Sequence, residues 1–329
     1  MQQPLVAISY AVDDGSREAI LQVLRDTARV VFLQDHQISG RLEVLRGADA
    51  VIGWRLNREL RSDELAQATA LRLIQFLSAG VDSVDFTAIP AGTVITDNAG
   101  AYARPMAEHV MAMALSLAKR LPQRHAALAR GEFEQQTPTL AIEGTVCAVL
   151  GFGGIGRRTA ELMRAFGVRI HAVNTSGHTT EDVEFIGTLA DLDKVLAAAD
   201  VLVLSLPLTR ATRGIIGDRE LALMKPTAIL VNVARAGIID EGALYEHLRA
   251  NPDFSAGIDT WWHEPPLGED FLTDYPFFGL SNVLGSPHNS AIVAGSQAVA
   301  ARHAAQNVRR YLGGNPPAGI VRREDYAGR

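Results

Sequence analysis

The sequence predicts an α/β protein of two domains, at least one of them doubly wound, with parallel strands between two layers of helices. The chain has 329 residues, more than most single cores hold, and 47% of them are apolar, as in ordinary globular proteins. Apolar runs of strand length alternate with stretches of helical spacing, the pattern of a parallel sheet with helical crossovers. One apolar run leads into a glycine-rich turn, GFGGIG, and a helix follows it directly.

The N-terminal part predicts one small α/β unit. Its apolar strand candidates are residues 4–10, 48–54 and 71–77, with helix-compatible stretches at 16–27 and 60–69. A long helix is expected next, from about Pro105 to Leu128, because apolar residues recur there at helical spacing and only Pro122, near its end, interrupts them. We expect this helix to bridge the two domains.

A second α/β series follows the long helix. Its strand candidates are residues 145–151, 168–174, 200–207, 227–234, 254–260 and 282–288. Helices are expected between them at 154–166, 189–198, 218–224 and 240–250. This order predicts a doubly wound nucleotide-binding domain. A last helix is expected in residues 296–314, ending at a pair of glycines.

The glycine-rich turn predicts a dinucleotide site. Gly151 permits a tight turn, Gly153 lets the backbone approach a pyrophosphate, and Gly156 lets the helix pack closely. Because a strand precedes the turn and a helix and second strand follow it, the pattern is far more specific than the glycines alone. The turn lacks the lysine of a phosphate-transfer loop, which argues against an ATPase.

The strand after this helix ends on Asn174, where an acid commonly binds the cofactor's ribose 2′-hydroxyl. A neutral amide can still bond a hydroxyl, but it does not repel a 2′-phosphate. No arginine follows in NTSGHTT, so His178 and Arg210 are candidates for the missing positive charge; the alternative is that both are merely solvated. The expected cofactor is therefore NADP or NAD, with NADP slightly favoured.

Composition and charge exclude several kinds of partner. The 31 basic and 37 acidic side chains give a net charge of −6, without a Lys/Arg-rich run, so nucleic acid is not expected. No apolar run reaches the roughly 18 residues of a membrane span, and the N-terminus lacks a signal-peptide pattern. We expect a cytoplasmic protein, in which the single cysteine, Cys147, is a buried and inert thiol. No metal is expected, because no His, Asp or Glu pair has ligand spacing, and His109 is expected in a core or interface.

A series of ordered motifs resembles the D-isomer-specific 2-hydroxyacid dehydrogenases, whose relatives include glyoxylate/hydroxypyruvate reductases and phosphoglycerate dehydrogenases. The motifs are LRLIQFLSAGVDSVD, NAGAYARPMAEHVMAMAL, GFGGIGR, LSLPLTRATRGIIG, MKPTAILVNVARAGIIDEGAL, AGIDTWWHEP and SPHNSA. The resemblance implies a Rossmann cofactor domain, residues 101–287, inserted in a flavodoxin-like substrate domain, residues 1–100 and 288–329. It also implies hydride transfer between NAD(P) and a small 2-keto acid or D-2-hydroxy acid, an active site in the cleft, and a homodimer.

The resemblance places a catalytic trio at three strand ends: Arg235 in NVARAG, Glu264 in WWHEP and His288 in SPHNSA. Histidine suits proton transfer to a carbonyl oxygen because it gives and takes protons near neutral pH. A nearby carboxylate orients the ring and favours its charged form. The arginine fork can hold the substrate carboxylate and polarise the ketone, as lysine could not.

Further site residues come from the same resemblance. Ser78, Ala79, Gly80 and Val81 match the loop whose backbone N–H groups receive the substrate carboxylate. Asp259 matches an acid at the nicotinamide end, and a structural, salt-bridged aspartate is the alternative. The other expected cofactor contacts are Gly151, Gly153, Gly154, Ile155, Gly156, Asn174, Thr175, Leu206, Pro207, Ala234 and His288.

Several alternatives stay open at this point. A formate-dehydrogenase-like enzyme would use a glutamine-supported histidine, against which Glu264 argues. A non-enzymatic dinucleotide-sensing protein could keep both the glycine turn and the trio, whereas an alanine dehydrogenase fits the ordered motifs poorly. Trp261 and Trp262 either line the pocket or pack in a core, and the segment after them, 265–282, either shapes substrate choice or contacts a second subunit. The family pattern is broken at Asn174, at Ala236 and at Asn289.

Overall fold

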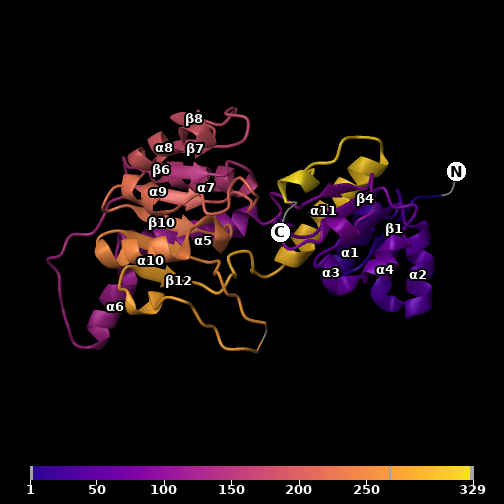
Figure 1. Ribbon diagram of the computed structural model, residues 1–329, viewed down its shortest axis with the longest axis horizontal. Helices are drawn as coiled ribbons and strands as arrows, with labels where there is room; N and C mark the ends of the chain where they lie inside the picture. The colour runs from indigo at the N-terminus through magenta and orange to yellow at the C-terminus, as the bar shows by residue number, and fades with distance from the viewer. Residues whose placement is uncertain (1–2, 267, 327–329) are drawn as a thin grey trace. The chain divides into compact units, whose positions relative to one another are not determined.

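The computed structural model describes residues 3–266 and 268–326 and divides into two compact units (Figure 1). The first unit holds the residues up to Tyr102 and those from Val293 onward, and the second unit is Ala103–Ile292. The chain thus crosses between the units slightly later, at both points, than the expected boundaries at 100/101 and 287/288. As a result, His288 and the turn that follows it belong to the second unit.

The first unit is built on a five-stranded parallel sheet in the order β2-β1-β3-β4-β5, the flavodoxin-like order. Its strands are β1 (Leu5–Ile8), β2 (Arg29–Phe32), β3 (Ala50–Gly53), β4 (Leu73–Phe76) and β5 (Val94–Thr96). Its helices are α1 (Asp14–Leu24), α2 (Ile38–Gly47), α3 (Leu56–Glu59), α4 (Ser62–Ala66) and α11 (Ser296–Leu312). Apolar residues of α1 and α11 cover one face of the sheet, and those of α2, α3 and α4 cover the other.

The second unit is built on a seven-stranded parallel sheet in the order β12-β11-β10-β9-β6-β7-β8. Its strands are β6 (Val146–Leu150), β7 (Arg169–Val173), β8 (Phe185–Gly187), β9 (Val201–Leu204), β10 (Ile229–Asn232), β11 (Ser255–Ile258) and β12 (Val283–Gly285). Its helices are α5 (Ala103–Ala118), α6 (Leu121–Ala129), α7 (Gly154–Ala165), α8 (Leu192–Ala198), α9 (Asp218–Leu223) and α10 (Glu241–Ala250). Helices α5 and α7 cover one face and α8, α9 and α10 the other. The strand order reverses between β6 and β9, which is where doubly wound sheets bind nucleotides.

The long helix expected from Pro105 to Leu128 is in fact two helices, so that prediction is wrong. The break lies at Arg120, whose backbone takes the left-handed conformation (φ 50°) between α5 and α6. Pro122 lies in the first turn of α6, where its fixed φ favours helix initiation and its missing N–H is not needed. Pro122 therefore begins a helix where it was expected to disturb the end of one.

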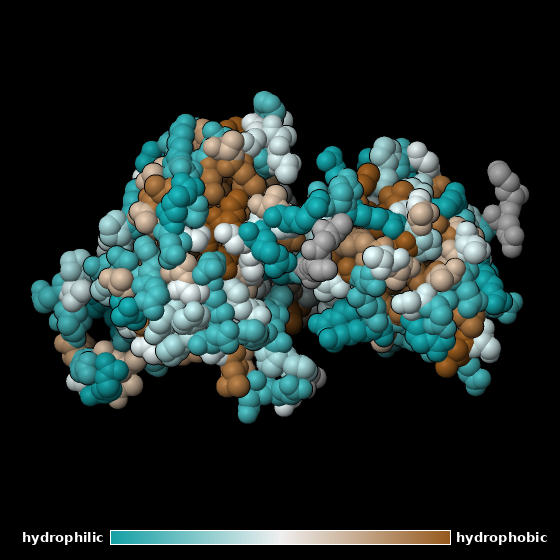
Figure 2. Space-filling view, viewed as in Figure 1, coloured by the Kyte–Doolittle hydropathy of each residue, from teal (hydrophilic) through white to brown (hydrophobic). Residues whose placement is uncertain are grey.

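The described helices include none that is long and apolar enough to cross a lipid bilayer. Figure 2 shows hydrophilic residues over most of the visible surface.

Candidate active site

The glycine turn lies between β6 and α7, and packing dictates two of its glycines. Gly151 has φ 98°, and a Cβ there would lie 2.4 Å from the backbone nitrogen of Leu206. A Cβ on Gly156 would lie 2.4 Å from the carbonyl oxygen of Gly151. These positions accept only glycine, because the turn and helix α7 pack directly against each other and against the end of β9.

Gly153 differs from the other two, because a Cβ there would meet nothing within 4 Å. It is the N-cap of α7, and no side chain caps the N–H groups of the first turn, which also holds no acidic residue. Such a helix start attracts an anion through its free N–H groups and its dipole. The open space at Gly153, with Gly154 and Ile155 in the first turn, therefore fits the pyrophosphate of a dinucleotide.

The other expected cofactor contacts lie at the same edge of the sheet. Leu206 and Pro207 follow β9, and Ala234 follows β10, so all three lie beyond the carboxyl ends of strands near the switch point. The loop after β9 is shaped by Thr212, whose hydroxyl donates to the carbonyl oxygen of Pro207.

Asn174 follows β7 and shapes its own loop. Its Oδ1 accepts the backbone N–H groups of Ser176 (3.1 Å) and Gly177 (2.7 Å), and its Nδ2 donates to the carbonyl oxygen of His178 (2.9 Å). Such self-bonding is the usual role of asparagine in turns. Thr175 and His178 are exposed in this loop, as is Arg210 in the loop after β9. The amide of Asn174 is therefore largely occupied by the loop itself.

The residues of the predicted trio lie beyond three neighbouring strands. Arg235 follows β10, Glu264 lies in the loop after β11, and His288 follows β12, so the parallel sheet brings their carboxyl-end loops together. The Nδ1 atom of His288 lies 2.8 Å from Oε2 of Glu264, while Oε1 of Glu264 accepts the backbone N–H of Trp261 at 3.1 Å. Arg235 donates from Nη1 to the carbonyl oxygen of Ala234 at 2.8 Å.

Electrostatics keeps Glu264 ionised. Burial alone would raise the pKa of the Glu264 carboxyl, but the hydrogen bond and charge of His288 oppose it, with smaller contributions from the N–H of Trp261 and from Arg235. The net effect lowers the pKa of Glu264 below its usual value. At neutral pH the imidazole of His288 thus faces a carboxylate.

The backbone of His288 is strained and is held by Asp259. His288 has φ 50°, an unusual conformation for a residue with a side chain. Its N–H donates to the carbonyl oxygen of Asp259 at 2.8 Å. The carboxylate of Asp259 accepts the next N–H groups, from Asn289 to Oδ1 (3.1 Å) and from Ser290 to Oδ2 (3.2 Å). The buried Asp259 therefore fixes the turn that carries His288, and its contact with a cofactor stays a prediction.

In the first unit, residues 78–81 lie beyond the carboxyl end of β4. The hydroxyl of Ser78 donates to the carbonyl oxygen of Gly80 at 2.8 Å and closes the loop, while Val81 is buried. Tyr10 and Trp54 follow β1 and β3 at the same edge of this sheet, and their rings meet edge to face at 6.5 Å. They were not among the expected site residues, although each ends an apolar run, 4–10 and 48–54.

Both tryptophans after Asp259 pack in a core. Trp261 is buried, its Nε1 donates to the carbonyl oxygen of Ser286, and its ring meets those of Phe277 and Phe278. Trp262 stacks on Phe277 with the rings 5.7 Å apart, and its Nε1 donates to the carbonyl oxygen of Ile239. The aromatic residues of segment 265–282 therefore anchor that segment to the second unit, which favours the core alternative over pocket lining.

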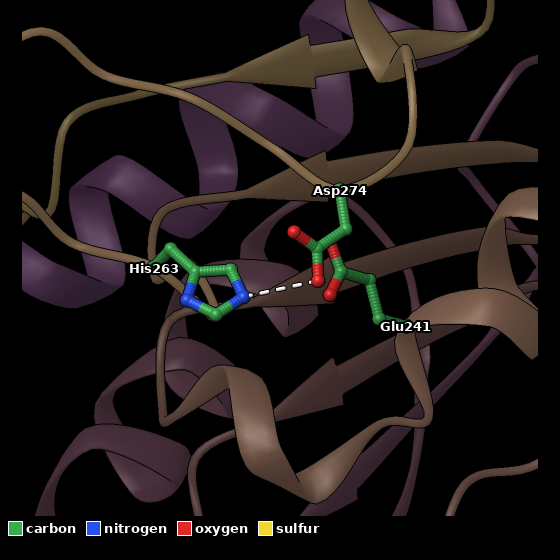
Figure 3. Close-up of side chains that lie close together, drawn as sticks. All are labelled: Glu241, His263 and Asp274. Atoms are coloured by element: carbon green, nitrogen blue, oxygen red, sulfur yellow. Dashed lines mark hydrogen bonds and ion pairs between the residues drawn. The ribbon is translucent and has the colours of Figure 1, made fainter.

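Glu241, His263 and Asp274 form a cluster near this segment, shown in Figure 3. Their potential ligand atoms lie within 4.8 Å of one another, and Nε2 of His263 contacts Oδ2 of Asp274 at 3.1 Å. Residue spacing could not have found this cluster, because its members come from α10, from the loop after β11 and from the segment before β12. His263 directly precedes Glu264, so its contact with Asp274 connects the loop that carries Glu264 to the segment 265–282.

The fold and the site define a class first: a two-unit α/β protein whose second unit has the doubly wound fold and glycine turn of dinucleotide-binding Rossmann domains. Residues 111–290 match the family model for the NAD binding domain of D-isomer specific 2-hydroxyacid dehydrogenases. The chain therefore belongs to the D-isomer specific 2-hydroxyacid dehydrogenases, an NAD(P)-dependent family acting on small 2-hydroxy and 2-keto acids. This confirms the resemblance, and the two parallel sheets confirm the predicted fold class.

Individual relatives cover most of the chain. A glyoxylate reductase of Aeropyrum pernix is 32% identical over 86% of this chain and 85% of its own length. A D-3-phosphoglycerate dehydrogenase of Methanocaldococcus jannaschii is 31% identical over 95% of this chain, which spans only 59% of that longer protein. The crystal structure of a D-isomer specific 2-hydroxyacid dehydrogenase from Xanthobacter autotrophicus Py2, in complex with NADPH and MES, matches with a TM-score of 0.78 and 25% identity, covering 98% of each chain.

Proposed function

We propose that the chain reduces a small 2-keto acid to a D-2-hydroxy acid, and catalyses the reverse oxidation, with NAD(P) as the hydride carrier. The observation that carries the proposal is the 2.8 Å contact between His288 Nδ1 and Glu264 Oε2, close to Arg235. These side chains supply what the reaction needs from a protein: a proton donor, a charge that supports it, and a group that binds a carboxylate.

His288 is the acid–base group in this proposal. With Nδ1–H directed to Glu264, the other ring nitrogen, Nε2, is left to hold the proton at the substrate oxygen. The ionised Glu264 holds Nδ1 in this contact and so fixes the ring with Nε2 as the nitrogen that serves the substrate oxygen. In the reverse direction the neutral ring accepts the proton from the hydroxyl of the 2-hydroxy acid.

Arg235 binds the substrate carboxylate. A guanidinium offers parallel N–H groups that match the two oxygens of a carboxylate, and its charge also polarises the neighbouring ketone. We also propose Ser78, Ala79, Gly80 and Val81 as backbone contacts of the substrate. Their place at the carboxyl end of β4, and the closure of their loop by the Ser78 hydroxyl, support this.

A dinucleotide is proposed to lie along the loops that follow β6, β7, β9 and β10. The N–H groups at the start of α7, next to Gly153, would hold its pyrophosphate, and Leu206, Pro207 and Ala234 would line its path. When bound, its reduced nicotinamide supplies the hydride. The residues of the chain contribute binding, orientation and the proton.

We propose that NADP is accepted as well as NAD and is slightly favoured. Asn174, directly after β7, carries no charge to repel a 2′-phosphate, and His178 and Arg210 are exposed in the loops after β7 and β9. In Asn174→Asp, kcat/KM for NADPH relative to NADH should fall about 10-fold or more, because a carboxylate would oppose the phosphate. Asn174→Ala is the control, since it removes the bonds with Ser176, Gly177 and His178 without adding charge. Equal changes in both variants would show that charge at this position is not the selector.

We propose a homodimer that covers helix α6 and the segment after it. None of the residues of α6 is buried, and Leu121, Leu128 and Phe133 are exposed by 54%, 55% and 76%. In Figure 1, α6 and the chain that follows it stand away from the sheet of the second unit. Exposed apolar residues grouped in this way are typical of subunit contacts.

Oligomeric state tests the dimer directly. Phe133→Lys should shift the protein toward the monomer in light scattering coupled to size exclusion, while Ile38→Lys, which changes an equally apolar exposed residue on α2, should not. A wild-type monomer, or a dimer unaffected by Phe133→Lys, would contradict this arrangement.

We also propose the cytoplasm as the compartment of this protein. Cys147 supports it, because burial raises the pKa of its thiol to about 12 and leaves the thiol inert.

The function itself is tested by initial rates. Glyoxylate, hydroxypyruvate, pyruvate and bulkier 2-keto acids would each be supplied with NADH and with NADPH, and reduced cofactor would be followed by its absorbance. We expect turnover with at least one small 2-keto acid. Tight dinucleotide binding without turnover of any of them would contradict the proposal and favour the dinucleotide-sensing alternative.

A further inference from the structure

His109 lies on helix α5 of the second unit. Its side chain contacts Ser286, which directly follows β12 of the seven-stranded sheet. Its Nε2 lies 2.9 Å from Oγ of Ser286, a residue 177 positions later in the chain. That hydroxyl lies 2.5 Å from Oδ1 of Asp259, and His109 Nε2 itself lies 3.7 Å from the same oxygen. The three side chains form a continuous chain of contacts within the second unit.

The direction of the hydrogen bonds in this chain follows from the groups present. A serine hydroxyl has one hydrogen, and an ionised carboxylate only accepts. The hydroxyl of Ser286 therefore donates to Asp259, and its oxygen must accept from His109. Nε2 of His109 consequently carries a hydrogen.

Asp259 is ionised in this setting. Burial would raise the pKa of Asp259, but the hydrogen bonds from Ser286 and Ser290, the nearby imidazole of His109 and the N–H of Asn289 together lower it below the usual value. A carboxylate enclosed in this way has a fixed orientation, because each oxygen has donors on a different side.

The other side of Asp259 faces the turn of His288. Successive N–H groups around a left-handed residue form a concave site for an anion, and the Asp259 carboxylate fills that site with bonds from Asn289 and Ser290. The same aspartate accepts the N–H of His288 through its carbonyl oxygen. Rotation of this carboxylate would break the bonds from Asn289 and Ser290, which hold the turn that follows His288.

We propose that His109 is a positioning residue, which through Ser286 fixes the carboxylate of Asp259 and thereby the turn that aims His288. The proposal rests on the function proposed above, in which His288 transfers the proton. The proposal gives His109 a role beyond core packing. In it His109 acts on His288 only through Ser286 and Asp259, not through direct contact with Arg235, Glu264 or His288.

The first test compares His109→Leu with His109→Gln. Leucine removes the donor and keeps the apolar bulk, whereas glutamine places an N–H at a similar reach from the helix. We expect kcat to fall about 10-fold or more in His109→Leu with KM for the keto acid changed less than about 3-fold, because orientation is lost while binding groups remain. His109→Gln should recover most of the loss. Wild-type kcat in His109→Leu, or a glutamine variant no better than the leucine one, would overturn the proposal.

A double-mutant cycle supplies the second test. If the effect of His109 passes through Ser286, the double variant His109→Leu with Ser286→Ala should be hardly slower than the slower single variant. Independent packing roles would instead multiply the two losses, and that outcome would contradict the proposal.

The third test does not depend on activity. Amide hydrogen exchange of His288, Asn289 and Ser290 should be about 10-fold faster or more in His109→Leu than in the wild type, because the bonds to Asp259 loosen. If exchange quickens while His288→Ala keeps full turnover, the positioning stands and the proposed role of His288 fails. Unchanged exchange would overturn the positioning itself.

Discussion

The side chains of His288 and Glu264 meet at 2.8 Å although they lie 24 positions apart and follow different strands. The contact exists because β11 and β12 are parallel neighbours, so the loops beyond their carboxyl ends lie side by side. Glu264 is ionised and also accepts the N–H of Trp261, which fixes the carboxylate against the imidazole. The protein's own contacts therefore fix how the carboxylate and the imidazole face each other.

Glu264→Gln keeps a side chain that can bond His288 but removes its charge. We expect kcat for keto-acid reduction to fall about 10- to 100-fold, because the imidazolium that donates the proton loses its counter-charge. Initial rates of keto-acid reduction by both proteins would check this, and full activity in Glu264→Gln would show that the charge is not used.

Arg235→Lys keeps the positive charge but loses the planar fork. KM for the keto acid should rise about 10- to 100-fold with a smaller change in the dinucleotide Kd, because only the bidentate grip on the carboxylate is lost. Arg249→Lys, an exposed arginine on α10 paired with Glu246, is the matched control and should leave both constants unchanged. An unaltered KM in Arg235→Lys would remove this arginine from substrate binding.

The glycine turn predicts different outcomes for two similar substitutions. Gly153→Ala places its methyl group in open space, so the thermal unfolding temperature should hardly change while the dinucleotide Kd rises about 10-fold or more. Gly151→Ala should lower the unfolding temperature as well, because its Cβ would collide with the backbone of Leu206 in a left-handed turn. Calorimetry with and without dinucleotide separates the two effects. Equal losses of stability in both variants would contradict this division of roles.

Asp97 makes the stability of the first unit depend on pH. Burial raises the pKa of its carboxyl from 3.8 to about 6. The folded state therefore binds this proton more tightly than the unfolded state. The resulting contribution of Asp97 to the free energy of unfolding is complete below about pH 4 and is lost as the pH rises through about 6.

Asp97→Asn should remove this dependence, because an amide keeps the acceptor for the N–H of Ala99 without ionising. At pH 7 to 8 we expect the variant to be more stable by about 3 kcal/mol, the free energy of a pKa shift from 3.8 to about 6. Urea unfolding of both proteins at pH 4 and pH 7.5 measures the difference. A gain at pH 4 as large as that at pH 7.5 would show that ionisation is not the cause.

Much of the fold is readable from the sequence because inner strands are continuous apolar runs. β1, β3 and β4 were all expected, and each is buried along its whole length. The strands that the sequence did not reveal are β2, β5 and β8, and each forms an edge of its sheet. Edge strands have partly exposed residues, which weakens the apolar signal.

The candidate site could be predicted from the sequence only where its residues end expected strands or form a motif. Arg235, Glu264 and His288 meet that condition. The link from His109 through Ser286 to Asp259 does not, because it joins a helix to a strand end 177 positions away and depends on the register of the sheet. The hydrogen bonds between the Asn174 side chain and its own loop could not be predicted either, because bonds within a turn leave no periodic pattern in the sequence.

The role of His288 as the proton donor is the central claim, and His288→Ala tests it most directly. Turnover of the best keto acid and dinucleotide binding by fluorescence titration would be measured in parallel, with His36→Ala, an exposed histidine of the first unit, as control. We predict that His288→Ala lowers kcat by about 100- to 10,000-fold while the dinucleotide Kd stays within about 3-fold, and that the control keeps both. Near-normal turnover in His288→Ala would contradict the account.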